Sequence, residues 1–260
     1  MKSILSGFLV AFSMYSAIPV PQIGWEKKTM RWALSFLPLV GLVVGGAEWL
    51  WFWFCGSVGA SAVFYAIVAA LLPLVISGGI HLDGLCDTCD ALCSFGDRDK
   101  RLAILKDSHV GAFGPLWVMA FLLAETACFA QAYETPRYLP CALMGFVLAR
   151  CFGAKKVVAM PCAKDTGLAH LFAENSDKKA VIVTLMAECL IALVALGLWI
   201  SGQGTSVFVW GVLLTVFWDQ GHQRLCMRVF GGNTGDLAGF FISTTELLWL
   251  AVAAFGGLLG

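Results

Sequence analysis

The chain has 260 residues, of which 59% are hydrophobic and only 13% are charged, and its mean hydropathy is +0.82. A soluble domain is roughly half apolar and about a quarter charged, so this composition excludes an ordinary soluble protein and indicates one embedded in a membrane. The formal net charge is zero and the chain has no basic tail, so its charge gives no indication of a nucleic-acid partner.

Apolar stretches near 20 residues recur along the chain, and a helix of that length crosses a hydrocarbon core of about 30 Å. In chain order the predicted membrane segments are 4–19, 32–54, 58–77, 112–131, 138–161, 180–200, 206–218 and 238–259. The first is short and fits a span, a re-entrant segment or an interfacial helix. The sequence therefore predicts an all-α fold, a polytopic helical membrane protein with seven or eight membrane segments in a single domain, 1–260, with the lipid bilayer as a partner.

Lysine and arginine gather in alternate connections between these segments. The connections 20–31, 78–111, 162–179 and 219–237 hold most of them, and the other connections are short and nearly uncharged. Short loops rich in positive charge stay on the cytoplasmic side of a membrane. We therefore expect a multi-pass protein of the cell membrane whose catalytic loops, near 78–111 and 219–237, face the cytoplasm.

The segment that follows the third apolar stretch contains Asp83, Asp87 and Asp90 at positions i, i+4 and i+7. If it is helical, steps of 100° per residue place the three carboxylates within about 60° of one another on one face. Oxygen ligands of this kind select Mg²⁺, Mn²⁺ or Ca²⁺, and Mg²⁺ commonly takes one or two carboxylates together with substrate phosphates. A solvated helix face is the simpler alternative.

Cations and glycines near these aspartates indicate phosphate chemistry. Arg98, Arg101 and Lys106 follow the aspartates, and a glycine-rich turn at 231–236 precedes the last apolar stretch. Carboxylates that bind metal beside cations that bind phosphate are what phosphoryl transfer requires. Glycines also let backbone N–H groups approach an anion closely. Arg150 lies within an apolar stretch, where ionisable groups are costly and often functional.

Two cysteines, Cys86 and Cys89, lie between the aspartates. Structural zinc and iron–sulfur sites normally need four ligands, and no second cysteine pair in the chain has matching spacing. We interpret both thiols as small packing residues.

These motifs resemble those of the cobalamin synthase family. The resemblance covers the run Gly-Gly-x-His-Leu-Asp-Gly-Leu-x-Asp-Thr-x-Asp at 78–90, Lys106-Asp107-Ser108 followed by Gly111 and Phe113-Gly114, and Gly-Gly-x-Thr-Gly-Asp at 231–236. Shorter matches at 18–21 and 36–41 extend it over almost the whole chain. The family often has arginine where this chain has His109 and Lys164; a lysine keeps the charge but loses bidentate phosphate geometry.

The resemblance implies an adenosylcobinamide-GDP ribazoletransferase. Such an enzyme transfers the phosphocobinamide part of adenosylcobinamide-GDP to α-ribazole or its 5′-phosphate, releases GMP and requires Mg²⁺. It implies that Asp83, Asp87 and Asp90 are catalytic and bind metal, with Asp236 as a further ligand. The general base is either His81 or an aspartate that is free of metal. The residues expected to bind substrate phosphates are Lys106, Arg98, Arg101, Ser108, Arg150, Lys164, Thr234 and Gly235.

Other classes of protein fit part of the pattern. Ion-coupled transporters also contain intramembrane carboxylates and broken helices, but here the carboxylates cluster in one loop and no paired interruptions occur in two halves. A non-catalytic corrinoid-binding scaffold and another Mg²⁺-dependent membrane phosphotransferase are further alternatives. The sequence leaves open both a homo-oligomer and association with other enzymes of cobalamin biosynthesis.

Overall fold

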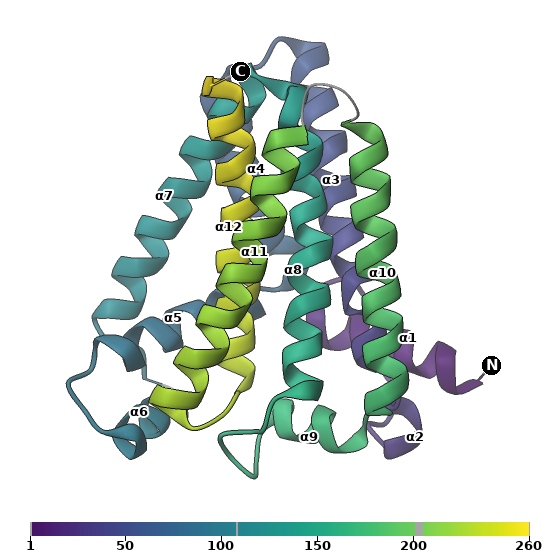
Figure 1. Ribbon diagram of the computed structural model, residues 1–260, viewed down its shortest axis with the longest axis vertical. Helices are drawn as coiled ribbons and strands as arrows, with labels where there is room; N and C mark the ends of the chain where they lie inside the picture. Colours follow the sequence, from purple (N-terminus) through teal and green to yellow (C-terminus); the bar gives the residue numbers. More distant parts are fainter. Residues whose placement is uncertain (1, 108, 201–204, 260) are drawn as a thin grey trace.

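The computed structural model describes residues 2–107, 109–200 and 205–259. These residues form helices joined by short connections, which confirms the predicted all-α fold (Figure 1). The helices, of which η1 and η2 are 3-10 helices and η3 is a π-helix, are α1 (Lys2–Tyr15), α2 (Lys27–Met30), η1 (Ala33–Phe36), α3 (Leu37–Val58), α4 (Ala62–Ser77), α5 (Ile80–Cys93), α6 (Arg98–Ile104), α7 (Phe113–Glu134), η2 (Pro136–Tyr138), α8 (Leu139–Ala159), α9 (Leu168–Asn175), α10 (Lys178–Trp199), α11 (Thr205–Leu225), η3 (Cys226–Phe230) and α12 (Gly235–Leu259).

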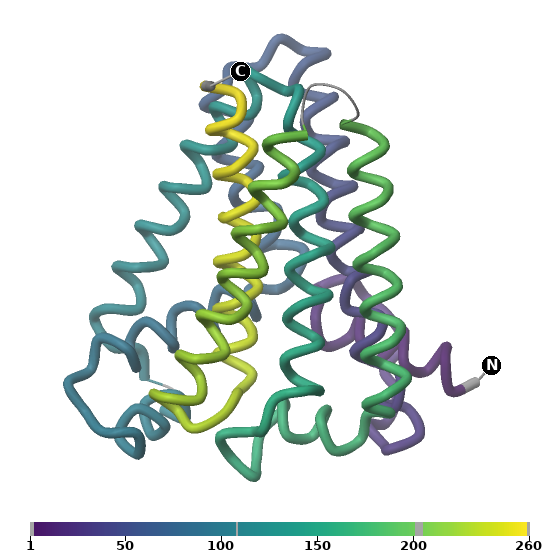
Figure 2. Tube along the Cα trace, in the orientation of Figure 1, coloured from purple at the N-terminus to yellow at the C-terminus, as the bar shows by residue number. Residues whose placement is uncertain are grey.

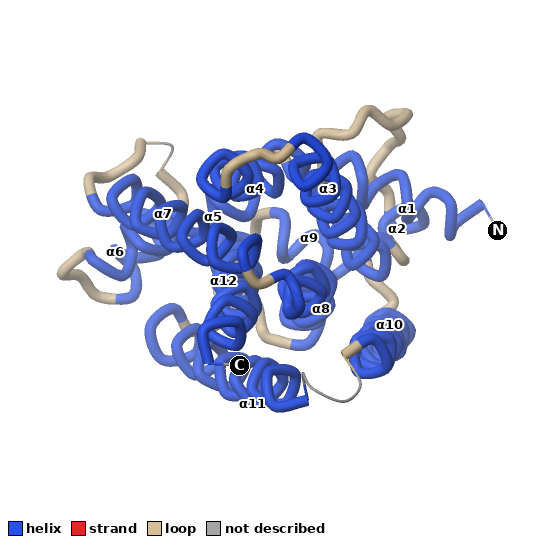
Figure 3. Tube along the Cα trace, turned by 90° about the horizontal axis from the view of Figure 1, so that it is seen from above, coloured by secondary structure: helices blue, strands red, loops and turns tan. Residues whose placement is uncertain are grey.

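The long helices run side by side along the long axis of the molecule, and the short helices α2, α6 and α9 gather at its lower end (Figures 1 and 2). Helix α12 packs against α5, α7, α8 and α11, whereas α10 stands at the periphery beside α8 (Figure 3). The indole of Trp249 on α12 is fully buried between glycines. A Cβ atom on either Gly145 or Gly211 would lie 2.5 Å from this side chain, so only glycine at these two positions leaves room for the tryptophan.

The multi-pass membrane protein predicted from the sequence is confirmed, but the count of seven or eight segments is not. Four helices of the described chain are long and apolar enough to cross a membrane, or five if the bent pair α4 and α5 forms one span. Helix α8 carries Arg150 and Lys156, and α11 carries Asp219, so charge reduces the hydropathy of both. Helix α1 has 14 residues, about 21 Å. It is therefore too short to cross about 30 Å of hydrocarbon.

A sharp turn separates α4 from α5. Gly78 and Gly79 lie in the left-handed region, with φ of +66° and +81°, where side chains are rarely tolerated. The two helix axes differ by 97°, so α5 leaves the line of the spanning helices and crosses the end of the bundle. The aspartate segment is helical, as predicted, and this turn fixes where its carboxylates point.

Two glycines allow α5 and α12 to cross in close contact. A Cβ atom on Gly84 of α5 would lie 2.7 Å from the carbonyl oxygen of Asp236, and one on Gly239 of α12 would lie 3.3 Å from the Cα atom of His81. Only glycine lets the two backbones approach this closely. The crossing brings the carboxylates of α5 to the first turn of α12.

We expect Gly84→Val to lower the melting temperature of the detergent-solubilised protein by at least about 2 °C, because overpacking typically costs about 1–3 kcal/mol. The activity should fall as well, since α5 and α12 must separate. Gly46→Val on α3 is the matched control, because a Cβ atom there meets nothing within 4 Å. Equal melting temperatures for the two variants in a thermal-shift assay would contradict this role for Gly84.

Candidate active site

A groove composed of two adjoining cavities lies at the end of the bundle where α5, α9 and the first turn of α12 meet. The inner cavity, about 150 Å³, is walled in part by Tyr15, His81 and Asp83. The outer cavity, about 220 Å³, is walled in part by Lys106 and Lys164. The two cavities adjoin, because they share the lining residues Leu168, Ala169, Gly235 and Asp236.

The acidic part of the groove comes from two helices. Asp83 and Asp87 lie one turn apart on α5, and Asp236 lies in the first turn of α12. Asp83 and Asp236 both line the inner cavity. Asp87 lies beside them: burial, and then the negative charges of Asp83, Asp236 and Asp90, raise its pKa to about 6, while Lys164 opposes the shift. A cation placed among these carboxylates would relieve their mutual repulsion.

This donor set fits Mg²⁺ only in part. Among the described residues, no three aspartate, glutamate, histidine or cysteine side chains are close enough together to hold a metal ion. Magnesium characteristically completes its shell with water and substrate phosphates rather than with protein ligands alone. The crowded carboxylates Asp83, Asp87 and Asp236 therefore fit an ion that arrives with a diphosphate.

The cysteines, which all lie in the described part of the chain, form no disulfide bond, and all ten are free thiols.

Thr234 shapes the start of α12. Its hydroxyl accepts the backbone N–H of Leu237 at 3.2 Å and donates to the Asp236 carboxylate at 3.4 Å. A threonine that accepts an N–H of the first turn is a favoured N-terminal cap. The hydroxyl of Thr234 thus holds Asp236 in place, and the adjacent Gly235 is exposed at the groove.

The glycine-rich turn is joined to the connection between α8 and α9. The backbone N–H of Asn233 donates to the carbonyl of Pro161 at 2.8 Å, and that of Ala163 donates to the carbonyl of Asn233 at 2.9 Å. A Cβ atom on Gly232 would lie 2.6 Å from the nitrogen of Ala163, so this contact requires glycine. The pairing places Lys164, the next residue, beside Asp236.

The two groove lysines face the acidic part. Burial lowers the pKa of Lys164; Asp236 and Asp87 raise it, and the positive charge of Lys106 lowers it further. These interactions place both lysines and the carboxylates within electrostatic reach of one another. A diphosphate in the outer cavity would meet residues of both signs, because Lys106, Lys164 and Asp236 all line it, and phosphoryl transfer uses such a combination.

Asp90 has a different environment from the other aspartates of α5. Its carboxylate is buried and accepts three backbone N–H groups, those of Gly111 at 2.9 Å, Phe113 at 3.0 Å and Gly114 at 2.9 Å. These groups belong to the start of α7, where unpaired N–H groups and the helix dipole both favour an anion. The carboxylate oxygens of Asp90 are therefore engaged in holding the start of α7.

Several predicted phosphate ligands are not at the groove. Arg98 donates to the carbonyl of Phe230 at 2.9 Å and packs on Gly231, so it fastens α6 to the turn. Arg101, on the same helix, lies outside the groove lining formed by the described residues. Ser108 lies outside the described residues.

Arg150 does not line either cavity of the groove. It is fully buried in α8, where it pairs with Glu246 of α12 and donates to the carbonyl of Phe146 at 2.9 Å. An uncompensated charge in the membrane interior is costly, so this pairing explains an intramembrane arginine without a phosphate.

His81 is a buried residue of α5 in the wall of the inner cavity. It is 5% exposed, and its ring stacks on that of Tyr15 with centroids 6.3 Å apart and an interplanar angle of 17°. Its Nε2 atom has no hydrogen-bond partner among the described residues. The imidazole thus borders the inner cavity two residues before Asp83.

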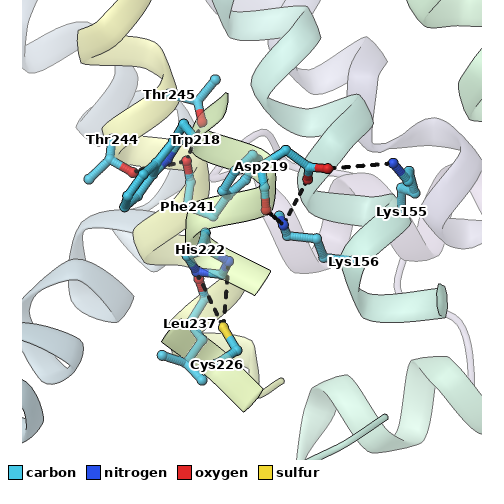
Figure 4. Close-up of polar contacts among 10 residues, drawn as sticks. All are labelled: Lys155, Lys156, Trp218, Asp219, His222, Cys226, Leu237, Phe241, Thr244 and Thr245. Atoms are coloured by element: carbon cyan, nitrogen blue, oxygen red, sulfur yellow. Dashed lines mark hydrogen bonds and ion pairs between the residues drawn. The ribbon is translucent and has the colours of Figure 1, made fainter. Parts of the chain in front are cut away.

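A polar network that the sequence did not indicate fixes α11 beside the site (Figure 4). Asp219 of α11 pairs with Lys156 of α8 at 2.7 Å, and the ammonium of Lys156 lies 4.5 Å from the ring centroid of Phe241. The Nε2 atom of His222 contacts the carbonyl of Leu237 at 2.9 Å. These contacts hold the helix that leads into the glycine-rich turn.

A bundle of membrane-length helices with carboxylates, lysines and a glycine-rich turn around one groove defines a membrane-embedded protein built for phosphate chemistry. Comparison with known proteins then identifies the family. Residues 7–254 match the family model described as cobalamin-5-phosphate synthase, and the chain belongs to that family. The resemblance seen in the motifs is therefore confirmed.

Individual relatives agree with this assignment. The chain is 34% identical to the adenosylcobinamide-GDP ribazoletransferase of Lachnoclostridium phytofermentans over 94% of this chain and 91% of the relative. It is 33% identical to that of a Geobacillus species, with 97% of each chain covered, and 34% identical to that of Desulfitobacterium hafniense, with 93% of each covered. No solved structure matches the chain.

Proposed function

We propose that this chain is a membrane transferase that joins adenosylcobinamide-GDP to α-ribazole or α-ribazole 5′-phosphate, giving adenosylcobalamin or its 5′-phosphate and GMP. The observation that carries the proposal is the family match over residues 7–254, in relatives that bear this activity in their names. The groove supports it, because carboxylates and lysines for a diphosphate meet there.

The reaction replaces one bond to phosphorus by another. A ribose hydroxyl of the acceptor attacks the phosphorus next to cobinamide, the bond from that phosphorus to the bridging oxygen breaks, and GMP departs with that oxygen. The hydroxyl proton passes to a base, for which His81 and an aspartate of the groove are the candidates. Lys106 and Lys164 hold the diphosphate, and the exposed backbone at Gly235 adds room for a phosphate oxygen.

Mg²⁺ is part of this proposal. Asp83, Asp87 and Asp236 would hold it, and when bound it supplies neutralisation of the charge that develops on the departing GMP. We propose that the groove faces the cytoplasm, because α6 carries three nearby cations, Arg98, Lys100 and Arg101, and Arg224 and Arg228 lie at the end of α11 and in η3.

The direct test is the release of GMP from adenosylcobinamide-GDP by the purified protein in detergent, with α-ribazole and Mg²⁺. GMP release that depends on α-ribazole supports the transferase. Binding of the corrinoid without GMP would instead indicate a scaffold, and substrate flux across proteoliposomes without GMP would indicate a transporter.

The orientation can be tested by labelling single cysteines in a chain whose native cysteines are replaced. We expect Asp99→Cys on α6 and Thr166→Cys before α9 to be protected from a membrane-impermeant thiol reagent added outside intact cells. Ser57→Cys, in the last turn of α3 at the opposite end of the bundle, should be labelled. Labelling of Asp99→Cys or Thr166→Cys would contradict a cytoplasmic groove. Both must react once the membrane is permeabilised, as the control.

A further inference from the structure

We propose that the inner cavity binds the aromatic base of the acceptor nucleoside, so that its lining selects which base enters the product. This inference rests on the proposed transferase function. The inference follows from three features of the inner cavity: its polar and apolar lining residues, its volume and its aromatic wall.

The inner cavity is polar at one end and apolar at the other. Asp236 and Gly235 line both cavities and so mark the junction between them. Ile242, which lies six residues after Asp236 on α12, is apolar, and so are the lining residues Leu37 of α3 and Val157 of α8. An acceptor nucleoside has the same order of groups: a ribose hydroxyl that must reach the diphosphate, and an apolar base on its other side.

The size and lining of the inner cavity exclude the corrin ring and the guanine base of the other substrate. The inner cavity has about 150 Å³, and an apolar cavity of that order binds a single benzene molecule. A corrin ring is far too large to enter it. Guanine has a dense set of hydrogen-bonding groups, which the apolar end cannot satisfy, and burying them unpaired is costly. A benzimidazole-type base can place its carbocyclic ring inside with its ribose at the junction.

One wall of the cavity is a fixed aromatic surface. The ring of Tyr15 on α1 is stacked on His81 of α5, and its centroid lies 5.7 Å from that of Phe172 on α9. Three helices thus hold the phenol ring in position. Aromatic groups gain from offset stacking or edge contact beyond simple burial, so this wall favours a flat aromatic ligand.

Val157 offers a test in both directions. It lines the inner cavity and not the outer one, and it lies on α8, a different helix from the groove carboxylates. Val157→Phe should fill the apolar end, and Val157→Ala should enlarge it. Val183→Phe makes the same change on the exposed face of α10 and serves as the control.

We expect Val157→Phe, which adds four carbon atoms, to raise the KM for α-ribazole at least about tenfold, because a single methylene too many in an apolar pocket already costs about tenfold or more. The KM for adenosylcobinamide-GDP should change less than about twofold, and Val183→Phe should leave both values unchanged. We expect Val157→Ala to increase kcat/KM for a riboside of a larger base, naphthimidazole, relative to α-ribazole. Equal changes in both KM values with Val157→Phe, or an unchanged base preference with Val157→Ala, would overturn the inference.

A binding measurement separates this inference from the proposed function. Equilibrium dialysis of α-ribazole with the purified protein should show weaker binding to Val157→Phe than to the wild type. If the wild type releases no GMP, the proposed function fails, and dialysis still decides on the cavity. Absence of α-ribazole binding, or equal binding by both proteins, would overturn the cavity assignment. Should Val157→Phe not fold, the base preference of Val157→Ala decides.

Discussion

Asp83→Asn, Asp87→Asn and Asp236→Asn are each expected to lower kcat for GMP release at least about a hundredfold, equivalent to about 2.7 kcal/mol of transition-state stabilisation. The expectation comes from their position, since Asp83 and Asp236 line the groove and Asp87 interacts electrostatically with both. Each substitution removes a charge from the donor set proposed for Mg²⁺. The Mg²⁺ concentration that gives half the maximal rate should therefore increase as well.

The same substitutions should leave the fold intact. The three carboxylates repel one another, so removal of one charge relieves repulsion and the melting temperature should stay the same or rise. Asp99→Asn, on the exposed surface of α6, is the control for a lost carboxylate away from the groove. Wild-type turnover in two of the three variants would show that these residues are not the metal ligands.

The sequence predicted the part of the site that depends on helix periodicity. Asp83 and Asp87 share a helix face because they are four residues apart, and this holds wherever the helix lies. Glycine at 84 and 239 then permits the crossing that brings Asp236 to them. Sequence motifs identified Asp236, but only the crossing of α5 and α12 shows which carboxylates it meets.

The role of Asp90 could not be read from the spacing. Asp90 lies on the same helix face as Asp83 but about 10 Å further along the axis, at 1.5 Å per residue. At that distance it meets the start of α7 rather than α12.

The partner of Arg150 could not be predicted from the sequence either. The sequence marked Arg150 as an ionisable residue in an apolar stretch. Its partner, Glu246, lies 96 residues away, and the packing of α8 on α12 brings the two together.

The predicted count of seven or eight spans is not confirmed, for a related reason. Hydropathy detects apolar composition, but it does not detect the direction of a helix. The 97° turn at Gly78 and Gly79 sends α5 across the bundle, and α1 ends after 14 residues. Both features depend on backbone conformation at a few positions, which an average over about 20 residues conceals.

Asp90→Asn is expected to reduce activity about tenfold to a hundredfold by a different route from the groove aspartates. One carboxylate oxygen accepts the N–H groups of Phe113 and Gly114, and the other accepts that of Gly111. An asparagine supplies one oxygen and one NH₂ group, so at least one N–H group loses its acceptor and faces another donor. Each buried N–H group left unsatisfied costs about 1–3 kcal/mol. Lys106 lies five residues before Gly111 and lines the outer cavity, so release of this segment displaces a residue that we propose binds the diphosphate.

The expected signature separates positioning from metal binding. Asp90→Asn should lower the melting temperature and raise the KM for adenosylcobinamide-GDP, while the Mg²⁺ concentration for half-maximal rate stays at the wild-type value. Asp83→Asn, the matched substitution two turns earlier on α5, should do the reverse: an unchanged melting temperature and a higher Mg²⁺ requirement. If Asp90→Asn instead melts like the wild type and needs more Mg²⁺, its carboxylate binds the metal during turnover, and the three N–H contacts seen here are exchanged for the ion.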